Sequence, residues 1–186
     1  MSRAGFVLVG GASVRMGRDK ALLPFRGAAL VDHVARQVGE AAGSVALVGH
    51  PERYAHLPYV LVADEYPGRG PLGGIHAALG ASGADWNLTV ACDMPGLTVP
   101  FLRELLDEAA SSGADCLAAR SPAGLPEPLC AVYHRRCRDS LAAWLEAGRH
   151  RAADWLASQR VAWRTVEAGD WLRNVNTPGQ WQERHG

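Results

Sequence analysis

The sequence predicts an α/β protein with three layers, in which helices cover both faces of a mostly parallel sheet. Three observations lead to this expectation. Short continuous apolar runs alternate with segments of helical periodicity along the 186 residues. Apolar runs without polar alternation are typical of strands that are buried on both faces. No internal repeat, low-complexity tract or long linker interrupts the chain, so we expect a single domain over residues 1–186.

The expected strands are short apolar runs bounded by turn-forming or charged residues, and the expected helices lie between them. The strands cover Phe6–Val9, Ser44–Val48, Tyr59–Val62, Asn87–Ala91, Asp115–Ala119, Leu129–Tyr133 and Val161–Val166. The helices cover Ala29–Ala42, Gly74–Ala81, Pro100–Ala110, Cys137–Glu146, Arg151–Ser158 and Pro178–Glu183. In such a sheet ligands bind at the carboxyl ends of the strands, so the residues that follow each apolar run are the first candidates for function.

The composition limits the classes of function. Basic and acidic residues number 19 each, so the formal net charge is zero and a nucleic-acid partner is not expected. No apolar segment approaches the roughly 20 residues that a membrane span needs, so a membrane partner is not expected either. The first apolar run breaks at Gly10-Gly11, which makes it too short for a signal peptide. The four cysteines lack metal-binding spacing, and we expect reduced thiols in a cytoplasmic protein.

The first candidate for chemistry is the loop after the first apolar run, GGASVRMGRDK at residues 10–20. Gly10 and Gly11 allow the backbone to approach a ligand closely, and successive N–H groups can surround an anion. Arg15 can donate two hydrogen bonds to phosphate oxygens, and Lys20 can add a point charge. The loop matches neither the Walker A motif nor the dinucleotide fingerprint. We interpret it as a triphosphate-binding loop, and the alternative is a plain strand–turn–helix connection with solvated charges.

A carboxylate directly follows another apolar run, in the segment TVACDMP at residues 89–95. Asp93 is expected at the mouth of the sheet because Pro95 prevents the strand from continuing. Mg²⁺ prefers hard oxygen ligands and often binds one or two carboxylates together with substrate phosphates. Asp93 is therefore the candidate metal ligand, and an ordinary turn or cap residue is the alternative. Cys92 is expected to be a packed thiol, since no base is evident beside it.

Another strand ends in carboxylates at Asp64 and Glu65, and a loop rich in glycine and proline follows. Gly73-Gly74 would permit close approach of a ligand to the N-terminus of the next helix, which favours anions. Loops that a rigid sheet positions often carry binding residues. The alternative is a flexible surface loop.

Three later segments are further candidates. Glu127 lies between two prolines and could face an acceptor substrate, although an edge strand would explain the prolines equally well. The cations in GRHR at residues 148–151 could meet a second phosphate or remain solvated. Asn174 and Asn176 point to the same side of an extended segment, and each can bond a polar heterocycle or a phosphate. They could also belong to a capped turn, because the threonine and proline that follow suit the start of a helix.

Together these motifs resemble the molybdenum cofactor guanylyltransferase family, whose members attach GMP to molybdopterin. The resemblance extends from Leu8 to Pro178. It rests on LVGGxSxRMGxDK at residues 8–20, GPLxG at 70–74, CDxP at 92–95 and NVNTP at 174–178. The first motif alone indicates only a nucleotidyltransferase, and the last narrows the family sharply.

The resemblance implies a Rossmann-like fold of the nucleotide-diphospho-sugar transferase type. The implied GTP contacts are Leu8, Val9, Gly10, Gly11, Lys20, Asp64 and Asp93. Asp93 would also bind Mg²⁺. The residues implied for catalysis or for molybdopterin are Arg15, Gly17, Asn174 and Asn176. We assign catalysis to Arg15, Lys20 and Asp93, and molybdopterin binding to the two asparagines. Transient protein partners would act in molybdenum insertion and molybdoenzyme maturation.

The chain departs from the family pattern at two places. Val9 stands where the family usually has alanine, and Gly49-His50 stands where an asparagine often follows the second strand and contacts guanosine. The pair Gly10-Gly11 also bears on the choice of base. Related cytidylyltransferases resemble Leu-Ala-Ala-Gly in this loop, and a glycine without a Cβ could make room for a purine.

The expected reaction is nucleotidyl transfer, in which the terminal phosphate of molybdopterin attacks the α-phosphorus of GTP and pyrophosphate leaves. A phosphate monoester is already anionic, so alignment and charge neutralisation matter more than a strong base. Mg²⁺ on Asp93 would bridge triphosphate oxygens, while Arg15 and Lys20 would stabilise the leaving pyrophosphate. Asp64 would orient the nucleotide or the metal. The alternatives are a related transferase that uses CTP or a sugar-phosphate acceptor, and a non-catalytic GTP- or cofactor-binding module.

Overall fold

The structure is a computed structural model that describes residues 1–9 and 19–166 of the chain. Within these residues seven strands form one sheet in the order β5-β4-β1-β6-β8-β7-β9. The strands are β1 (Arg3–Leu8), β4 (Val45–Gly49), β5 (Val60–Ala63), β6 (Trp86–Ala91), β7 (Cys116–Arg120), β8 (Pro126–His134) and β9 (Val161–Thr165). Every neighbouring pair is parallel except the two pairs that contain β8. The prediction of a mostly parallel sheet is confirmed.

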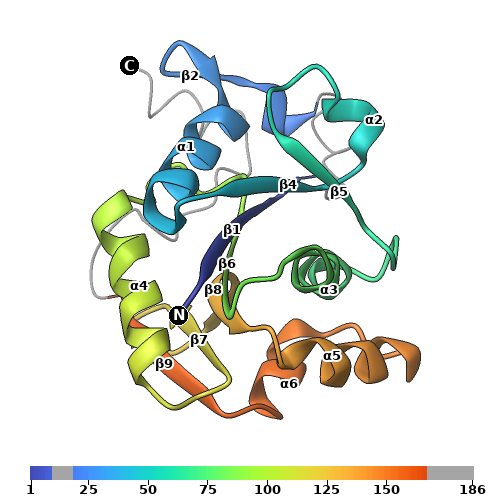
Figure 1. The fold of residues 1–186 in the computed structure, drawn as a ribbon, viewed down its shortest axis with the longest axis vertical. Coiled ribbons are helices and arrows are strands. Elements are labelled where there is room, and N and C mark those ends of the chain that lie inside the picture. Colours follow the sequence, from blue (N-terminus) through green and yellow to red (C-terminus); the bar gives the residue numbers. More distant parts are fainter. Residues whose placement is uncertain (10–18, 167–186) are drawn as a thin grey trace.

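Helices cover both faces of this sheet, as Figure 1 shows. One face carries α1 (Leu30–Ala42) and α4 (Val99–Ser111). The other carries α3 (Pro71–Ala81), α5 (Cys137–Glu146) and α6 (Ala152–Ala157). The three-layer α/β architecture predicted from the sequence is therefore confirmed. The predicted helix Pro178–Glu183 lies outside the described residues.

Several short elements were not predicted. A 3-10 helix, η2 (Lys20–Leu22), is followed by a small hairpin of β2 (Pro24–Phe25) and β3 (Ala28–Ala29). A single helical turn, α2 (Pro51–Tyr54), follows β4. These pieces are too short for a hydrophobic period to identify them. They surround the carboxyl ends of β1 and β4, so they contribute to the region where ligands are expected.

β8 corrects one interpretation of the sequence. Its prolines suggested an edge strand, but β8 lies between β6 and β7. The prolines are tolerated because β8 pairs with β6 only from Cys130 onward, while Pro126 and Pro128 precede this point. Since β8 is antiparallel to β6, its first residues lie at the carboxyl end of β6. Glu127 is therefore carried to the same edge of the sheet as the residues that follow β6.

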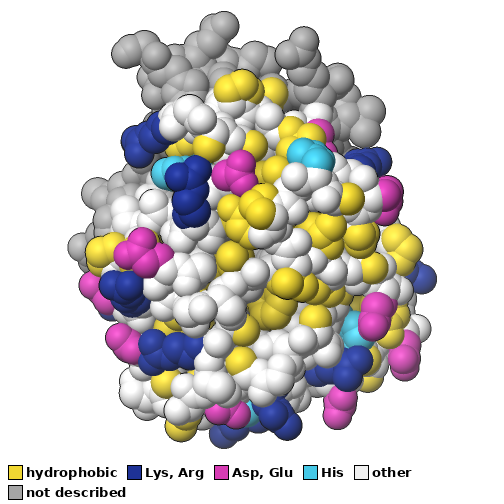
Figure 2. Space-filling view, turned by 45° about the horizontal axis from the view of Figure 1, so that its top comes forward, with side chains coloured by type: hydrophobic (Ala, Val, Ile, Leu, Met, Phe, Trp, Pro, Cys, Tyr) yellow, Lys and Arg dark blue, Asp and Glu magenta, His cyan; other side chains and the backbone are white. Residues whose placement is uncertain are grey.

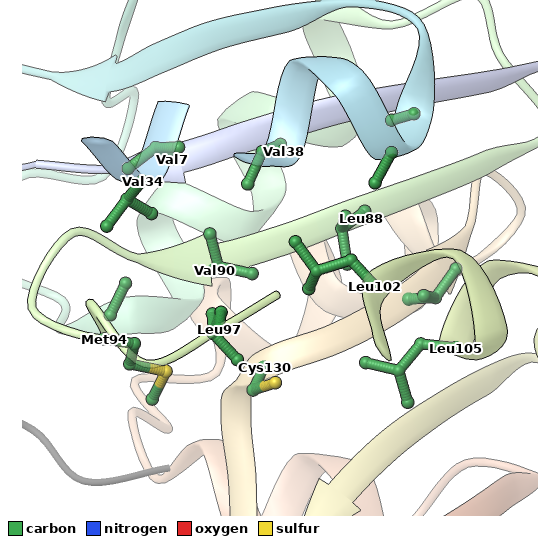
Figure 3. Close-up of a cluster of buried hydrophobic side chains, with 14 of the residues drawn as sticks. Val7, Val34, Val38, Leu88, Val90, Met94, Leu97, Leu102, Leu105 and Cys130 are labelled. Atoms are coloured by element: carbon green, nitrogen blue, oxygen red, sulfur yellow. The ribbon is translucent and has the colours of Figure 1, made fainter. Parts of the chain in front are cut away.

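The larger hydrophobic core lies between the sheet and the helices α1 and α4 (Figure 3). Val7 of β1 and Val90 of β6 are fully buried there, which is consistent with their continuous apolar runs. Met94 and Leu97, just beyond β6, are also buried in this cluster. Burying a side chain of this size stabilises the fold by about 1.5–3 kcal/mol. The core thus anchors the turn after β6, on which Asp93 is carried.

Two general properties follow from the described residues. No helix among them is long and apolar enough to cross a bilayer. All four cysteines are free thiols, and three of them are buried.

Candidate active site

The carboxyl ends of β1, β4, β5 and β6 bring four predicted site segments to one edge of the sheet. Val9 continues β1 and donates its N–H to the Val48 carbonyl at 2.8 Å. The N–H of Asp64 donates to the Gly49 carbonyl at 3.3 Å, and the N–H of Cys92 donates to the Leu8 carbonyl at 3.2 Å. Strand pairing therefore positions the backbone on which Asp64 and Asp93 are carried. The sequence correctly predicted that these strand ends meet.

Two of the predicted catalytic side chains are in direct contact. The Nζ of Lys20 lies 3.0 Å from Oδ2 of Asp93, although the two residues are 73 positions apart in the chain. Lys20 is only 7% exposed, and the Asp93 side chain is 20% exposed. Charges that are buried to this extent need a partner, and a charge-assisted hydrogen bond supplies one. An ammonium group has several N–H donors, so the same lysine can serve both Asp93 and a phosphate oxygen.

The second carboxylate oxygen of Asp93 differs from the first. Oδ1 is buried, and no described residue offers it a hydrogen bond. An unpartnered buried acceptor costs about 1–3 kcal/mol, so such an atom indicates a missing partner. A hard, partly buried carboxylate oxygen is a suitable ligand for Mg²⁺ or a similar divalent cation. The donor chemistry at Asp93 therefore fits the predicted metal. Among the described residues, no group of three or more His, Cys, Asp and Glu side chains is arranged so that it could hold a metal ion by itself.

A second carboxylate lies at this edge on β8. Glu127 is partly buried, and the first cause of its raised pKa is burial, followed by the negative charge of Asp93. Glu127 is thus close enough to Asp93 to feel its charge, and a contact of Glu127 with an acceptor substrate stays a prediction.

Asp19 and Tyr54 belong to the site, but sequence reasoning assigned them no role. Asp19 caps η2 by accepting a hydrogen bond from the Ala21 N–H at 3.0 Å on Oδ1. Its Oδ2 accepts a hydrogen bond from the Tyr54 hydroxyl at 2.8 Å. Tyr54 is fully buried, and burial followed by the bond to Asp19 raises its pKa far above the usual range. The signal available in the sequence was the position of Asp19 immediately before Lys20.

Asp64 is held by the loop in which it lies. Its Oδ1 accepts a hydrogen bond from the Tyr66 N–H at 2.8 Å. A Cβ on Gly73 would lie 2.7 Å from this same oxygen, and a Cβ on Gly74 would lie 2.7 Å from the Leu8 side chain. The glycine pair therefore lets α3 pack against the Asp64 loop and β1. The space that a Cβ would need at these glycines is occupied by protein atoms, and the approach of a ligand to the N-terminus of α3 stays a prediction.

The structure also explains the departure at Gly49. A Cβ at this position would lie 2.1 Å from the Val9 carbonyl oxygen, closer than any side chain permits. A residue with a side chain at position 49 would displace the backbone of Val9, just before the loop at residues 10–18. Glycine is therefore required here by the close approach of β1 and β4.

The cations predicted after α5 line a surface hollow. This hollow has a volume of about 360 Å³ and is lined by Trp144, Arg149, His150, Arg151 and Asp154. The guanidinium of Arg149 stacks over the Trp144 ring at 4.6 Å, and Arg69 Nη1 donates to His150 Nε2 at 2.9 Å. Arg69 belongs to the loop between β5 and α3, so the hollow adjoins that end of the sheet.

The other predicted site residues lie outside the described part of the chain. They are Gly10, Gly11, Arg15, Gly17, Asn174 and Asn176. Cys92 lies within it, and burial raises the pKa of its thiol to about 12, with a further contribution from Asp93. A thiol with this pKa is protonated at neutral pH, which agrees with the expectation of a packed thiol.

On the face turned forward in Figure 2, acidic, basic and histidine side chains are interspersed, and no broad basic surface is visible among the coloured residues.

The mostly parallel sheet and the buried lysine–aspartate pair at its carboxyl edge are consistent with an α/β nucleotidyltransferase-like domain. A family model described as "MobA-like NTP transferase domain" matches residues 5–163. A protein of Synechococcus elongatus named probable molybdenum cofactor guanylyltransferase is 36% identical, over 98% of this chain and 97% of the relative. A Bacillus cereus protein of the same name is 30% identical over 95% of this chain and 93% of its own length.

The chain therefore belongs to the MobA-like nucleotidyltransferase family, with molybdenum cofactor guanylyltransferases among its near-full-length relatives. Solved structures agree. A crystal structure of molybdopterin-guanine dinucleotide biosynthesis protein A from Archaeoglobus fulgidus matches with a TM-score of 0.82 and 26% identity, over 97% of this chain and 95% of that one. A Mycobacterium tuberculosis protein, solved in complex with manganese, shares the fold at 19% identity with a TM-score of 0.67 and 98% and 97% coverage. The family resemblance noted in the sequence is confirmed.

Proposed function

We propose that this protein transfers GMP from GTP to the terminal phosphate of molybdopterin and releases pyrophosphate. The observation that carries the proposal is the Lys20–Asp93 pair, in which one buried carboxylate oxygen has no described partner. The near-full-length relatives named as guanylyltransferases support the identity of both substrates. We further propose that residues 1–186 act as one domain, in the cytoplasm.

The reaction forms one phosphorus–oxygen bond and breaks another. An oxygen of the acceptor phosphate attacks the α-phosphorus of GTP, and the bond from that phosphorus to the oxygen bridging to the β-phosphate breaks. The electron pair of the broken bond leaves with pyrophosphate. Because the attacking phosphate is already anionic, the protein mainly has to align the two substrates and neutralise charge.

Asp93 and Lys20 divide this work between them. Asp93 would hold a divalent metal, for which we propose Mg²⁺, and the metal would supply positive charge that reduces the charge of the triphosphate. Lys20 directs one N–H to Asp93 Oδ2, which leaves Oδ1 for the metal. The positive charge of Lys20, together with that of Arg15, stabilises the charge that develops on pyrophosphate.

The remaining contacts follow the two sides of the sheet edge. On the nucleotide side we propose Leu8, Val9, Gly10, Gly11 and Asp64 as GTP contacts. As molybdopterin contacts we propose Asn174 and Asn176, and as further candidates for the acceptor side we propose Glu127 and the cationic hollow at residues 149–151. Proteins of molybdenum insertion and molybdoenzyme maturation would meet the acceptor side, where cofactor arrives and leaves.

The direct test is pyrophosphate release from GTP with and without molybdopterin, in Mg²⁺ and in excess chelator. We expect pyrophosphate release that requires both molybdopterin and Mg²⁺. When CTP replaces GTP under the same conditions, we expect at least about tenfold less pyrophosphate. Equal turnover with CTP, or with a sugar phosphate in place of molybdopterin, would assign a related transferase. Tight GTP binding without release under any condition would assign a non-catalytic module.

A further inference from the structure

The hydroxyl of Tyr54 donates its hydrogen bond to Asp19, the residue that precedes the catalytic Lys20. Tyr54 is the last residue of α2 and is fully buried, and its Oη donates to Asp19 Oδ2 at 2.8 Å. A buried phenol keeps its hydroxyl only where it finds a partner. Here that partner is a carboxylate 35 positions earlier in the chain. The bond joins the segment after β4 to the segment that carries Lys20.

Asp19 has a donor on each oxygen as a result. Oδ2 receives the Tyr54 hydroxyl, and Oδ1 receives the Ala21 N–H at 3.0 Å. Asp19 is the carboxylate nearest to Lys20 in the chain, yet the Lys20 ammonium reaches Asp93 at 3.0 Å. Asp93 keeps one buried oxygen without a described donor, whereas Asp19 keeps none. Asp19 thus has a described hydrogen-bond donor on both carboxylate oxygens, whereas Asp93 has one on only one of its oxygens.

We propose that Tyr54 is a positioning residue, which engages Asp19 so that Lys20 is directed to Asp93 and the Asp19 charge is withheld from the triphosphate. The proposal rests on the proposed function, because it assigns a triphosphate to this edge of the sheet. It extends the site to α2, which follows β4, beyond η2, which carries Lys20, and the turn after β6, which carries Asp93.

Deleting the hydroxyl has a defined consequence. In Tyr54→Phe the carboxylate of Asp19 loses the donor to Oδ2, and a partly buried carboxylate oxygen without a donor is unfavourable. The freed carboxylate would then be attracted to a cation of the site, either the Lys20 ammonium or a metal bound with the nucleotide. Asp19 would compete with the triphosphate for that cation, so binding of GTP weakens.

The experiment compares GTP affinity, measured by calorimetry in Mg²⁺, for four proteins. These are the wild type, Tyr54→Phe, Tyr54→Phe with Asp19→Asn, and Tyr133→Phe. The last variant is a matched control, because Tyr133 is also fully buried and also donates one hydrogen bond, to the Pro128 carbonyl. It packs in the cluster with α3, α5 and α6, away from α2.

We expect Tyr54→Phe to weaken GTP binding about tenfold, and the added Asp19→Asn to restore affinity to within about threefold of the wild type. The Asp19→Asn substitution keeps an oxygen for the Ala21 N–H but removes the charge, so rescue identifies the freed charge as the cause. Tyr133→Phe should lower the melting temperature without weakening GTP binding. The proposal is overturned if both tyrosine variants weaken binding equally, if the double variant binds no better than Tyr54→Phe, or if the wild type binds no GTP. Failure of the proposed function is a separate result, namely GTP binding by the wild type without pyrophosphate release.

Discussion

Two aspartates at opposite edges of the same sheet show how the molecule separates stability from function. Asp115 directly precedes β7, whereas Asp93 follows β6, which runs parallel to β7 within the sheet. Asp115 is bonded on both oxygens: Arg160 donates to Oδ2 at 2.8 Å and to Oδ1 at 2.9 Å, and Arg136 also donates to Oδ1. Asp93 receives one bond, from Lys20, and its other oxygen is buried without a described partner.

The difference teaches where to expect chemistry. A structural carboxylate is satisfied by the protein itself, and the bonds from Arg160 and Arg136 lower the pKa of Asp115 to about 2. Asp93 keeps one buried oxygen without a partner among the described residues, which makes that oxygen the candidate for binding a ligand. The distinction rests on hydrogen bonds rather than on exposure, since the Asp93 and Asp115 side chains are exposed to similar extents, 20% and 15%.

The largest expected effect is on turnover. Asp93→Asn removes the charge that would hold the metal, so we expect pyrophosphate release per folded molecule to fall about 10²–10³-fold. Asp115→Asn should leave turnover per folded molecule within about twofold, because this edge of the sheet is remote from the site. Steady-state rates at saturating GTP, normalised to folded protein, measure both. Comparable losses in the two variants would remove the distinction between the edges.

The next largest effect is on stability, and it concerns the backbone where β1 and β4 end, at the edge of the sheet that carries Asp93. Gly49→Ala places a Cβ 2.1 Å from the Val9 carbonyl oxygen, so we expect a loss of about 2–3 kcal/mol in the free energy of unfolding. For a domain of this size the melting temperature should fall by about 5–10 °C. Gly83→Ala is the matched control, since nothing lies within 4 Å of its added Cβ. A melting temperature for Gly49→Ala equal to that of the control would show that Val9 does not constrain this position.

A smaller effect on stability is expected at Asp115, which lies at the opposite edge of the sheet from Asp93. Asp115→Asn weakens the bonds to Arg136 and Arg160, whose side chains are 47% and 69% exposed. Because both arginines can be solvated, we expect the free energy of unfolding to fall by only about 1–2 kcal/mol. Chemical denaturation measures this change. A loss of about 3–5 kcal/mol in the free energy of unfolding, as large as that for breaking a buried ion pair, would contradict the expectation that water solvates the two guanidinium groups in the variant.

The smallest effect is the pH dependence of that contribution. The pKa of Asp115 is about 2 in the folded protein, below its ordinary value of 3.8, so folding favours the ionised carboxylate. Its stabilisation is therefore fully present above about pH 4 and is lost as the pH falls towards 2. The difference in melting temperature between the wild type and Asp115→Asn should shrink over this range. A difference that stays constant from pH 5 to pH 2 would contradict the assignment.

The sequence predicted the parallel part of the fold well because its strands are continuous apolar runs, such as that of β6, which is buried along its whole length. It did not predict that β8 lies inside the sheet. The prolines lie where β8 pairs with β7 alone, and a strand end that is paired on one side looks like part of an edge strand. The meeting of Lys20 and Asp93 could be anticipated, because both follow strands whose carboxyl ends share one edge.

Other parts of the site depend on contacts that no local pattern encodes. Tyr54 ends a helix of a single turn, and only the folded chain shows that its hydroxyl reaches Asp19. The glycines at 73 and 74 have the composition of a ligand-binding loop, yet the atoms that require them to be glycine are those of Asp64, Tyr66 and Leu8. A glycine in the sequence can indicate that other atoms approach the backbone closely, but only the folded structure shows whether those atoms belong to the protein or to a ligand.

The measurement that tests the central claim most directly is the binding of Mn²⁺, as a probe for Mg²⁺, in the presence of GTP. Electron paramagnetic resonance counts the bound metal in the wild type, Asp93→Asn and Asp115→Asn. The account predicts tight binding of Mn²⁺ with GTP by the wild type and by Asp115→Asn, and a loss of affinity of at least about tenfold in Asp93→Asn. Undiminished Mn²⁺ binding by Asp93→Asn would contradict the claim that the open oxygen of Asp93 is a metal ligand.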